Sequence, residues 1–243
     1  MCEQFGKTKI IPGGFAEYFR VPAPNLRIDT LKIPNNLSFE EATLIEPVAC
    51  CIRAIRKCNV QPGDIVAIIG AGPSGIINTM LLKNSNASKI IVNDIVDYRL
   101  KVAKRLGADL TINAKKEDFV EKLKNVTDGK GADLVIVTAP SIEAFSEGMQ
   151  ACRKGGVLCL FAPTSPEAQA RINPHRLFFS EITIIPSYST SHVETRMALE
   201  MINSGKVKAK ELITHRFPLT QIQYAFKTAV ESRECLKVVI TND

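Results

Sequence analysis

The feature that most constrains this chain is a short apolar run, Ile65–Ile69, followed at once by glycines at Gly70, Gly72 and Gly75. An uninterrupted apolar run of this length is typical of a strand buried on both faces of a parallel sheet. Glycines at this spacing are typical of a turn that binds a dinucleotide: the first permits the tight turn, the second lets the backbone approach a pyrophosphate, and the third lets the next helix pack on the strand. The stretch therefore predicts a nucleotide-binding strand–turn–helix unit.

The residues around this turn support the same interpretation. Pro73 suits a first helical turn, where a backbone N–H would have no partner, and the free N–H groups of that turn would face the phosphates. A second apolar strand, Lys89–Val92, leads to Asp94, which lies about 20 residues past the glycines, where an acid accepts hydrogen bonds from an adenosine ribose. The alternative is an ordinary turn and an aspartate that caps the next helix; strand, turn, helix and acid together favour cofactor binding.

Length and composition narrow the class further. The chain has 243 residues, of which 45% are hydrophobic, enough to bury the core of one large domain, or of one domain and part of another. The net charge of +6 comes from scattered lysines, so we expect no nucleic-acid partner. No uncharged apolar run reaches the roughly 18 residues of a membrane span, and the first residues lack the apolar core of a signal peptide. The seven cysteines form no C-x-x-C pair, which favours a reducing compartment, and we expect a cytoplasmic protein.

From Val60 onward, short apolar runs alternate with segments of helical periodicity. The expected strands are Ile65–Ile69, Lys89–Val92, Asp109–Ile112, Leu134–Val137, Val157–Phe161 (after Gly155-Gly156) and Ile182–Ile185. The expected helices between them are Pro73–Leu82, Asp97–Leu106, Glu117–Val126 and Ser141–Cys152, with an irregular crossover over Pro163–Ser180. This alternation predicts an α/β fold with a six-stranded, doubly wound parallel sheet.

In such sheets, ligands bind beyond the carboxyl ends of the strands. The segments expected there are Gly70–Gly75, Asp94, Thr138–Ser141, Phe161–Thr164 and Ser187–Ser189. A cofactor is therefore expected beside these segments.

The segment before this unit does not resemble the start of a domain. Gly13–Val21 indicates a turn followed by an alternating strand, and Ser38 begins a capping-box pattern that opens a helix running to Ile55. Pro47 predicts a kink or break inside that helix. Glu46 is then either a surface glutamate at a helix end or, in its apolar setting, a metal ligand or active-site acid.

After the sixth strand the pattern changes. A second capping box at Ser191 opens a helix, Ile213–Leu219 indicates a strand, Thr220 is expected to cap a further helix, and Leu236–Ile240 indicates a closing strand. These elements could either extend the main sheet or cover a neighbouring domain.

Motifs spread over the whole chain resemble one family. They are Gly13–Tyr18 (Gly-Gly-Phe-Ala-Glu-Tyr), Ile45–Pro47, Val60–Asp64, Gly70–Gly75, Arg105–Asp109 and Leu212–Leu219. Together they resemble the zinc-dependent medium-chain alcohol dehydrogenases, especially the sorbitol and threonine dehydrogenase branch. The resemblance implies a Rossmann dinucleotide-binding domain over residues 47–187 and a remnant of a GroES-like, β-rich catalytic domain over residues 1–46 and 188–243. It also implies hydride transfer from a secondary alcohol or polyol to NAD.

The family's functional positions carry over only where this sequence matches them. Glu46 resembles the branch's third protein position at the catalytic zinc, and Cys2 resembles the last of four structural-zinc cysteines. The residues implied at the cofactor are Gly70, Gly72, Pro73, Ser74, Gly75, Asp94, Arg99, Phe161, Ala162, Pro163, Ser187, Tyr188 and Ser189. No His-Glu dipeptide is present, so the family's zinc-holding Gly-His-Glu motif has no counterpart, and no catalytic residue is assigned in this chain.

The sequence favours one cofactor and one activity, and each has an alternative. A carboxylate at Asp94 favours a ribose diol and repels a 2′-phosphate, so NAD is expected rather than NADP, although Arg99 could accommodate the phosphate. The family's amino-terminal part is not in the sequence, so we expect a truncated form: natural, wrongly started or engineered. The alternative function is a catalytically inactive NAD(H)-binding module. A methyltransferase with a similar glycine turn would not account for Leu212–Ile240. By resemblance we also expect a homo-oligomer that pairs through Ile182–Ile185.

Overall fold

The computed structural model describes residues 9–242, and its contacts divide the chain into two compact units. One unit is Pro47–Thr190; the other combines Met1–Glu46 with Ser191–Asp243. Within the described residues, no helix has both the length and the apolar character needed to cross a bilayer.

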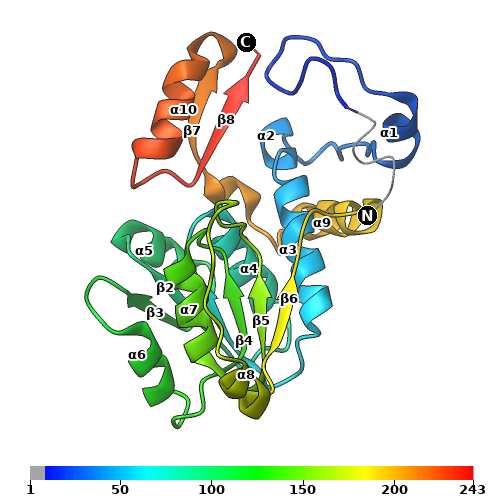
Figure 1. Ribbon diagram of the computed structural model, residues 1–243. Coiled ribbons are helices and arrows are strands. Elements are labelled where there is room, and N and C mark those ends of the chain that lie inside the picture. Colours follow the sequence, from blue (N-terminus) through cyan, green and yellow to red (C-terminus); the bar gives the residue numbers. More distant parts are fainter. Residues whose placement is uncertain (1–8, 243) are drawn as a thin grey trace. The chain divides into compact units, whose positions relative to one another are not determined.

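The larger unit is built on a six-stranded parallel sheet with the strand order β3-β2-β1-β4-β5-β6 (Figure 1). The strands are β1 (Ile65–Ile69), β2 (Lys89–Asp94), β3 (Leu110–Asn113), β4 (Ala132–Val137), β5 (Cys152–Leu160) and β6 (Thr183–Pro186). β1 pairs with β2 on one side and with β4 on the other. The order reverses beside β1, which is where a doubly wound sheet leaves a crevice at its carboxyl edge. The predicted fold class is confirmed.

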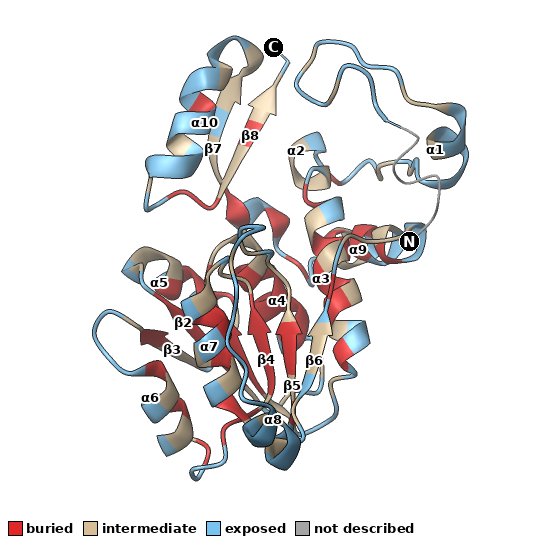
Figure 2. Cartoon of the chain, viewed as in Figure 1, coloured by how far each residue is buried: buried red, intermediate tan, exposed pale blue. Residues whose placement is uncertain are grey.

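Helices cover both faces of this sheet. They are α3 (Ile45–Cys58), whose first two residues belong to the other unit, α4 (Pro73–Lys83), α5 (Asp97–Arg105), α6 (Phe119–Asn125), α7 (Ile142–Ala151) and α8 (Pro174–Ser180). Ala67 and Ile69 of β1 join the core cluster formed with α6 and α7. Val66 and Ile68 point to the opposite face and are fully buried as well, which explains why β1 is apolar at every position (Figure 2).

The sequence places the helix break at the wrong residue. The structure has α2 (Phe39–Ala42) with the capping box at Ser38, and then α3, so the chain breaks before Pro47. Pro47 is the third residue of α3, in the first turn, where the missing N–H removes no intrahelical bond. A proline at that position starts a helix instead of interrupting one.

Two further helices are missing from the prediction. The expected irregular crossover contains α8, in which the Asn173 side chain accepts a hydrogen bond from Arg176 N and Pro174 occupies the first turn. The proline-rich amino-terminal segment contains α1 (Ala23–Ile28). The strand expected before it is wrong: only an isolated antiparallel bridge joins Ile11 to Arg20. Pro24 and Pro174 both lie in first helical turns, where proline is tolerated.

The start of β5 also differs from the expectation. Gly155 and Gly156 lie within the strand, which begins at Cys152. Ala132 pairs with Cys152, and the next pair is Leu134 with Val157, so residues 153–156 of β5 form a bulge opposite one residue of β4. Glycine is required because Gly155 has a φ of +68° and a Cβ on Gly156 would lie 2.9 Å from the Arg153 carbonyl oxygen.

The smaller unit has a sheet of its own. Its two strands, β7 (Ile213–Pro218) and β8 (Lys237–Thr241), are parallel and are joined by the turn η2 (Leu219–Gln221) and the helix α10 (Ile222–Glu231). The remaining elements are α9 (His192–Asn203), with its capping box at Ser191, and the turn η1 (Ala209–Leu212). Of the two arrangements left open by the sequence, extension of the main sheet is wrong. The Thr220 cap is also wrong, because α10 begins at Ile222 without a side-chain cap.

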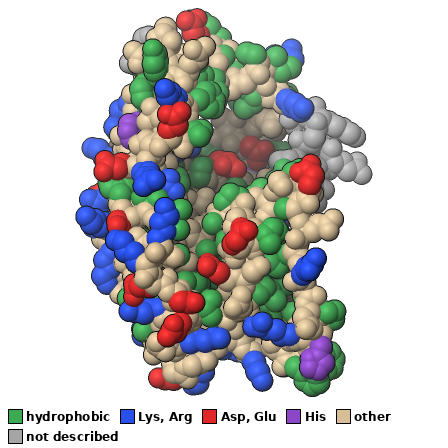
Figure 3. All heavy atoms as spheres, turned by 60° about the vertical axis from the view of Figure 1, so that its left-hand side comes forward, with side chains coloured by type: hydrophobic (Ala, Val, Ile, Leu, Met, Phe, Trp, Pro, Cys, Tyr) green, Lys and Arg blue, Asp and Glu red, His purple; other side chains and the backbone are tan. Residues whose placement is uncertain are grey.

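An ion pair joins two segments of the smaller unit that lie far apart in the sequence, α2 and β7. Both nitrogens of the Arg216 guanidinium fork donate to the Glu40 carboxylate, at 2.7 and 2.8 Å. The hydrogen bond from Arg216 is the largest cause that holds the pKa of Glu40 below its usual value, and the positive charges of Arg216 and Lys210 act in the same direction against the raising effect of burial. On the face seen in Figure 3, acidic and basic side chains are interspersed.

We expect Gly75→Ala to destabilise the larger unit and Gly72→Val to leave it folded. A Cβ on Gly75 would lie 1.9 Å from the Gly70 carbonyl oxygen, so helix and turn must separate, at a cost of about 1–3 kcal/mol. A Cβ on Gly72 meets nothing within 4 Å, and the cost at this helix-capping position should stay below about 1 kcal/mol. Urea unfolding of the two variants measures the difference. Equal loss of stability would contradict the packing role of Gly75.

Candidate functional site

The turn after β1 has the geometry that its glycines were expected to provide. Gly70 has a φ of +103°, and its N–H donates to the Asn93 carbonyl at the end of β2, at 2.7 Å. Gly75 lies so close to Gly70 that any side chain would collide with the Gly70 carbonyl. The conformational reasons for these two glycines are therefore confirmed.

Gly72 has a different role, because nothing in its own backbone requires glycine. Its φ is −68°, and the space that a Cβ would occupy is open. Gly72 is the N-cap residue of α4, and no side chain caps the N–H groups of that first turn. Pro73 and Ser74 follow as the first helical residues, both half-buried. Bare main chain at the amino end of an 11-residue helix, beside open space, fits an anion such as a pyrophosphate.

Asp94 ties this turn to the end of β2. Its carboxylate accepts hydrogen bonds from Ala71 N at 2.6 Å and from Val96 N at 2.8 Å, one on each oxygen, and only 9% of the residue is exposed. Each carboxylate oxygen can accept a second bond. Asp94 therefore has a structural role in the turn, although it does not cap α5, whose N-cap residue is Val96 and which has no side-chain cap. Its carboxylate still has acceptor capacity for two ribose hydroxyl groups.

The neighbouring carboxylate is occupied by side chains. Asp97, in the first turn of α5, accepts bonds from Lys116 Nζ at 2.8 Å and from Asn113 Nδ2 at 2.6 Å. The hydrogen bond from Lys116, followed by that from Asn113, holds the pKa of Asp97 below its usual value. Arg99, two residues further along the same helix, is half-buried, and its Nε has no hydrogen-bond partner among the described residues. A buried guanidinium N–H without an acceptor would be stabilised by a ligand oxygen.

The other expected residues lie after the two strands at the far end of the sheet. Phe161, Ala162 and Pro163 follow β5, and the backbone N–H groups of the first two donate to the Val137 carbonyl, both at 3.1 Å. Ser187, Tyr188 and Ser189 follow β6. Because the strands are parallel, these segments lie at the same sheet edge as the glycine turn.

The segment after β6 has an unusual polar and conformational character. The Ser187 Oγ is buried and lacks a hydrogen-bond partner among the described residues, whereas Tyr188 is 66% exposed. Ser189 has a φ of +60°, a left-handed conformation that non-glycine residues adopt at some cost. An unsatisfied hydroxyl and a strained residue in one short segment are features found at ligand sites.

Thr138 is a site residue that sequence reasoning placed at this edge without giving it a role. Its Oγ1 donates to the carbonyls of Ile69 at 3.0 Å and Gly70 at 2.9 Å, and so holds the turn from the β4 side. The available signal was its position directly after a strand that neighbours β1. Strand order decides that adjacency, and a single sequence does not reveal strand order.

The expected metal position has no supporting ligand set in the described part of the chain. Glu46 is exposed, as the second residue of α3. Residues 9–242 contain no group of three or more His, Cys, Asp or Glu side chains that could hold a metal ion. Cys2, the expected structural-zinc position, lies outside the described residues. The described residues therefore place no further group of ligands with Glu46, and its role at a metal stays a prediction.

A Rossmann sheet with a glycine turn and an acid at the end of its second strand is the arrangement typical of dinucleotide-binding α/β proteins. The family model described as "Zinc-binding dehydrogenase" matches residues 73–204. The chain belongs to the zinc-binding dehydrogenase family, as the sequence motifs predict.

Three comparisons place the chain within this family. The sorbitol dehydrogenase of Bacillus subtilis (strain 168) is 33% identical over 239 residues, covering 98% of this chain and 66% of that protein. The alcohol dehydrogenase from Thermus sp. ATN1 aligns with a TM-score of 0.87 at 27% identity, covering 95% of this chain and 66% of that chain. A protein described as a short chain alcohol dehydrogenase from Escherichia coli CFT073, in complex with NADH, aligns with a TM-score of 0.84 at 25% identity, covering 94% and 66%. This chain thus spans just under two thirds of the length of each.

We expect Thr138→Val to lower the free energy of unfolding by about 0.5–1.5 kcal/mol, because the isosteric side chain removes a hydroxyl that bonds two turn carbonyls. The matched control is Thr111→Val in β3, a half-buried threonine whose side chain makes no hydrogen bond to another described residue. Chemical denaturation measures both variants. If Thr111→Val lowers the free energy of unfolding as much as Thr138→Val, the hydrogen bonds of Thr138 to the turn do not stabilise the protein specifically.

Proposed function

We propose that this chain is the NAD-binding part of an alcohol or polyol dehydrogenase that transfers a hydride between a secondary alcohol and NAD. The observation that carries the proposal is the arrangement at the carboxyl end of β1: an uncapped helix mouth at Gly72 lies next to open space, and Asp94 is hydrogen-bonded to the same turn. Family membership and the NADH complex of the Escherichia coli protein support it.

The chain's own residues would bind and orient the cofactor. Main-chain N–H groups at the start of α4 would donate hydrogen bonds to the pyrophosphate, and the spare lone pairs of Asp94 would accept hydrogen bonds from the adenosine ribose hydroxyls. The buried hydroxyl of Ser187 and the segment Phe161–Pro163 would contact the remainder of the dinucleotide along the same edge. When bound, the nicotinamide supplies the hydride acceptor.

The chemistry at Asp94 favours NAD over NADP. The carboxylate is buried and held by two N–H donors, so it cannot rotate away from a 2′-phosphate without leaving those donors unpaired. A phosphate there would meet a negative charge in a poorly solvated position. NADP could bind only if Arg99 held its 2′-phosphate. Arg99 lies on the helix that follows Asp94, and its Nε has no hydrogen-bond partner among the described residues.

A second candidate is an NAD(H)-binding module without dehydrogenase activity. It is favoured by one observation, the lack of a metal-ligand group within residues 9–242. Glu46 stays our candidate for a zinc position, and no step of the hydride transfer is assigned to it here.

Domain roles and assembly complete the proposal. We assign residues 47–187 to the cofactor domain, and residues 1–46 and 188–243 to part of a GroES-like catalytic domain, with alcohols or polyols as substrates. β6 ends the sheet with one open edge, and a second copy could pair there to continue it. A homo-oligomer formed in this way would be detected by light scattering.

Wild-type chain should bind NADH, and Gly72→Val should abolish binding, since the valine side chain would fill the space next to the helix mouth. Fluorescence titration with NADH measures both, and a circular dichroism spectrum confirms that the variant is folded. Unchanged affinity in the folded variant would refute the proposed pyrophosphate position.

Turnover separates the two candidate functions. NAD-dependent oxidation of sorbitol, threonine and 2,3-butanediol is measured together with bound zinc. Turnover by this chain rejects the inactive-module candidate, whereas NADH binding without turnover of any of the three supports it.

Asp94→Ala should weaken NADH binding more than NADPH binding, because it removes both the acceptor for the ribose diol and the repulsion of a 2′-phosphate. The loss for NADH should be about tenfold or more, the size of one hydrogen bond to a charged group. The variant also leaves Ala71 N and Val96 N without their acceptor, so its unfolding must be measured alongside. The ratio of the two affinities is independent of that general loss, and an unchanged ratio would contradict the ribose role.

A further inference from the structure

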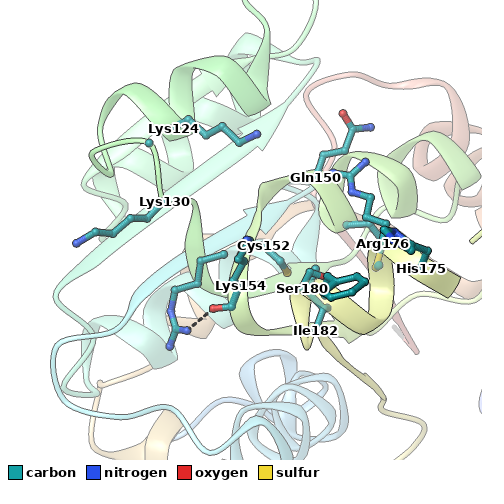
Figure 4. A pocket seen from close by; sticks show the side chains of 13 residues that line it. Lys124, Lys130, Gln150, Cys152, Lys154, His175, Arg176, Ser180 and Ile182 are labelled. Carbon is teal, nitrogen blue, oxygen red and sulfur yellow. Dashed lines mark hydrogen bonds between the residues drawn. The ribbon is translucent and has the colours of Figure 1, made fainter. Parts of the chain in front are cut away.

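The larger unit has a second concave surface, at the amino ends of its strands. Gly129 and Lys130 precede β4, Cys152 begins β5 and Ile182 precedes β6, and all four line a pocket of about 670 Å³ (Figure 4). This volume lies within the range of small-molecule sites, about 300–1,000 Å³. The glycine turn and Asp94 lie at the opposite, carboxyl edge of the same sheet, so this pocket is separate from the proposed cofactor position.

One wall of the pocket is held in place by the bulge in β5. Arg153 Nε donates to Asp133 Oδ1 at 2.5 Å, and Arg153 Nη1 donates to the Lys154 carbonyl at 2.7 Å. The other carboxylate oxygen of Asp133 accepts a bond from Ile65 N at 2.7 Å, at the start of β1. A fixed bulge therefore presents Lys154 at the pocket, and bulges of this kind are common beside functional sites.

The lining is basic and contains no acid. Of its thirteen residues, the charged ones are Lys124, Lys130, Arg153, Lys154 and Arg176, and none is Asp or Glu. Arg153 is paired with Asp133, but no ion pair is recorded for the other four cations within residues 9–242. In Figure 4, Lys124 points toward the side on which Gln150 and Arg176 lie, whereas Lys130 points away. This segregation contrasts with the interspersed charges of Figure 3.

The remaining surface of the pocket is apolar and partly aromatic. Phe179 is 62% exposed, and its ring lies 4.7 Å from that of His175 at an interplanar angle of 53°. Met149 and Ile182 also line the pocket. An exposed aromatic ring beside unpaired cations offers a stacking surface for a flat apolar group and charge for an anion.

We propose that this pocket binds a small organic phosphate, with the phosphate held by Lys124, Lys154 and Arg176 and the apolar part of the ligand against Phe179. A phosphate dianion has three acceptor oxygens, which matches several cations that lack a carboxylate partner, and the planar Arg176 guanidinium can donate two parallel bonds to it. The volume of the pocket fits a small molecule. This pocket lies at the amino edge of the sheet, away from the proposed cofactor position, so the ligand and the cofactor can be bound at the same time.

The test uses 1-naphthyl phosphate as the probe, in calorimetric titrations of the full chain at low ionic strength, with and without excess NADH. We expect saturable binding with one site, and an affinity unchanged by NADH. Lys154→Glu and Arg176→Glu should each weaken binding about tenfold or more, the size of a lost hydrogen bond between charged groups. The charge-matched control is Lys227→Glu, an exposed lysine of α10 in the other unit, which should change the affinity less than about twofold.

Two further ligands test the chemistry. Uncharged 1-naphthol and inorganic phosphate should each bind at least about tenfold more weakly than the probe, because each lacks one of its two parts. The proposal is overturned if no saturable binding occurs, if Lys227→Glu weakens binding as much as Lys154→Glu, or if NADH displaces the probe. Displacement would place the probe in the cofactor groove. Because the probe is also titrated without NADH, the result does not depend on whether this chain binds NADH.

Discussion

The hydrogen bond from Ala71 N–H to the Asp94 carboxylate is the contact on which the proposed site depends. Ala71 is fully buried and lies between Gly70 and Gly72, so its N–H has no access to water. A buried N–H without an acceptor costs about 1–3 kcal/mol. The carboxylate therefore fixes the turn and is itself fixed by it. The Asp94 carboxylate, which would bind the ribose, and the turn that would bind the pyrophosphate are therefore held together before any ligand binds. This preorganisation lowers the entropic cost of binding.

Close packing at Gly75 has a second consequence for the same unit. Because helix and turn approach too closely for any side chain, the first residues of α4 lie directly beyond the carboxyl end of β1. No side chain caps the first turn of that helix, which follows Gly72, and nothing lies within 4 Å of a hypothetical Cβ at Gly72. Gly70 and Gly75 set the geometry of the turn, and Gly72 keeps the space next to the helix open. Each of the three positions therefore requires glycine for a different reason.

The features that could be predicted from sequence are those that depend on neighbours along the chain. The apolar run of β1, the proline start of α4 and the capping boxes at Ser38 and Ser191 all act within a few residues, and all agree with the structure. The errors occur where proline or glycine has more than one interpretation. Pro47 and Pro174 mark helix starts here, and Gly156 lies within a bulge that a neighbouring strand imposes.

The site shows the same division. The glycines and Asp94 were identifiable because their spacing is local, whereas the role of Thr138 depends on β4 lying beside β1. The basic pocket could not be predicted at all, since its cations come from α6, from the loop before β4, from the β5 bulge and from α8, a helix that the sequence did not indicate.

The two edges of the sheet use different chemistry to attract negative charge. At the carboxyl edge, the proposed donors to a pyrophosphate are main-chain N–H groups, which carry no net charge. They can bind the pyrophosphate although the negatively charged Asp94 is hydrogen-bonded to the same turn. At the amino edge, the cations are side chains at the surface, and their attraction is screened by salt over about 8–10 Å. Binding at the amino edge should therefore fall steeply with ionic strength, whereas binding at the carboxyl edge depends mainly on fixed geometry. A parallel sheet keeps the two edges a full strand length apart, so an anion at one edge has little electrostatic influence on the other.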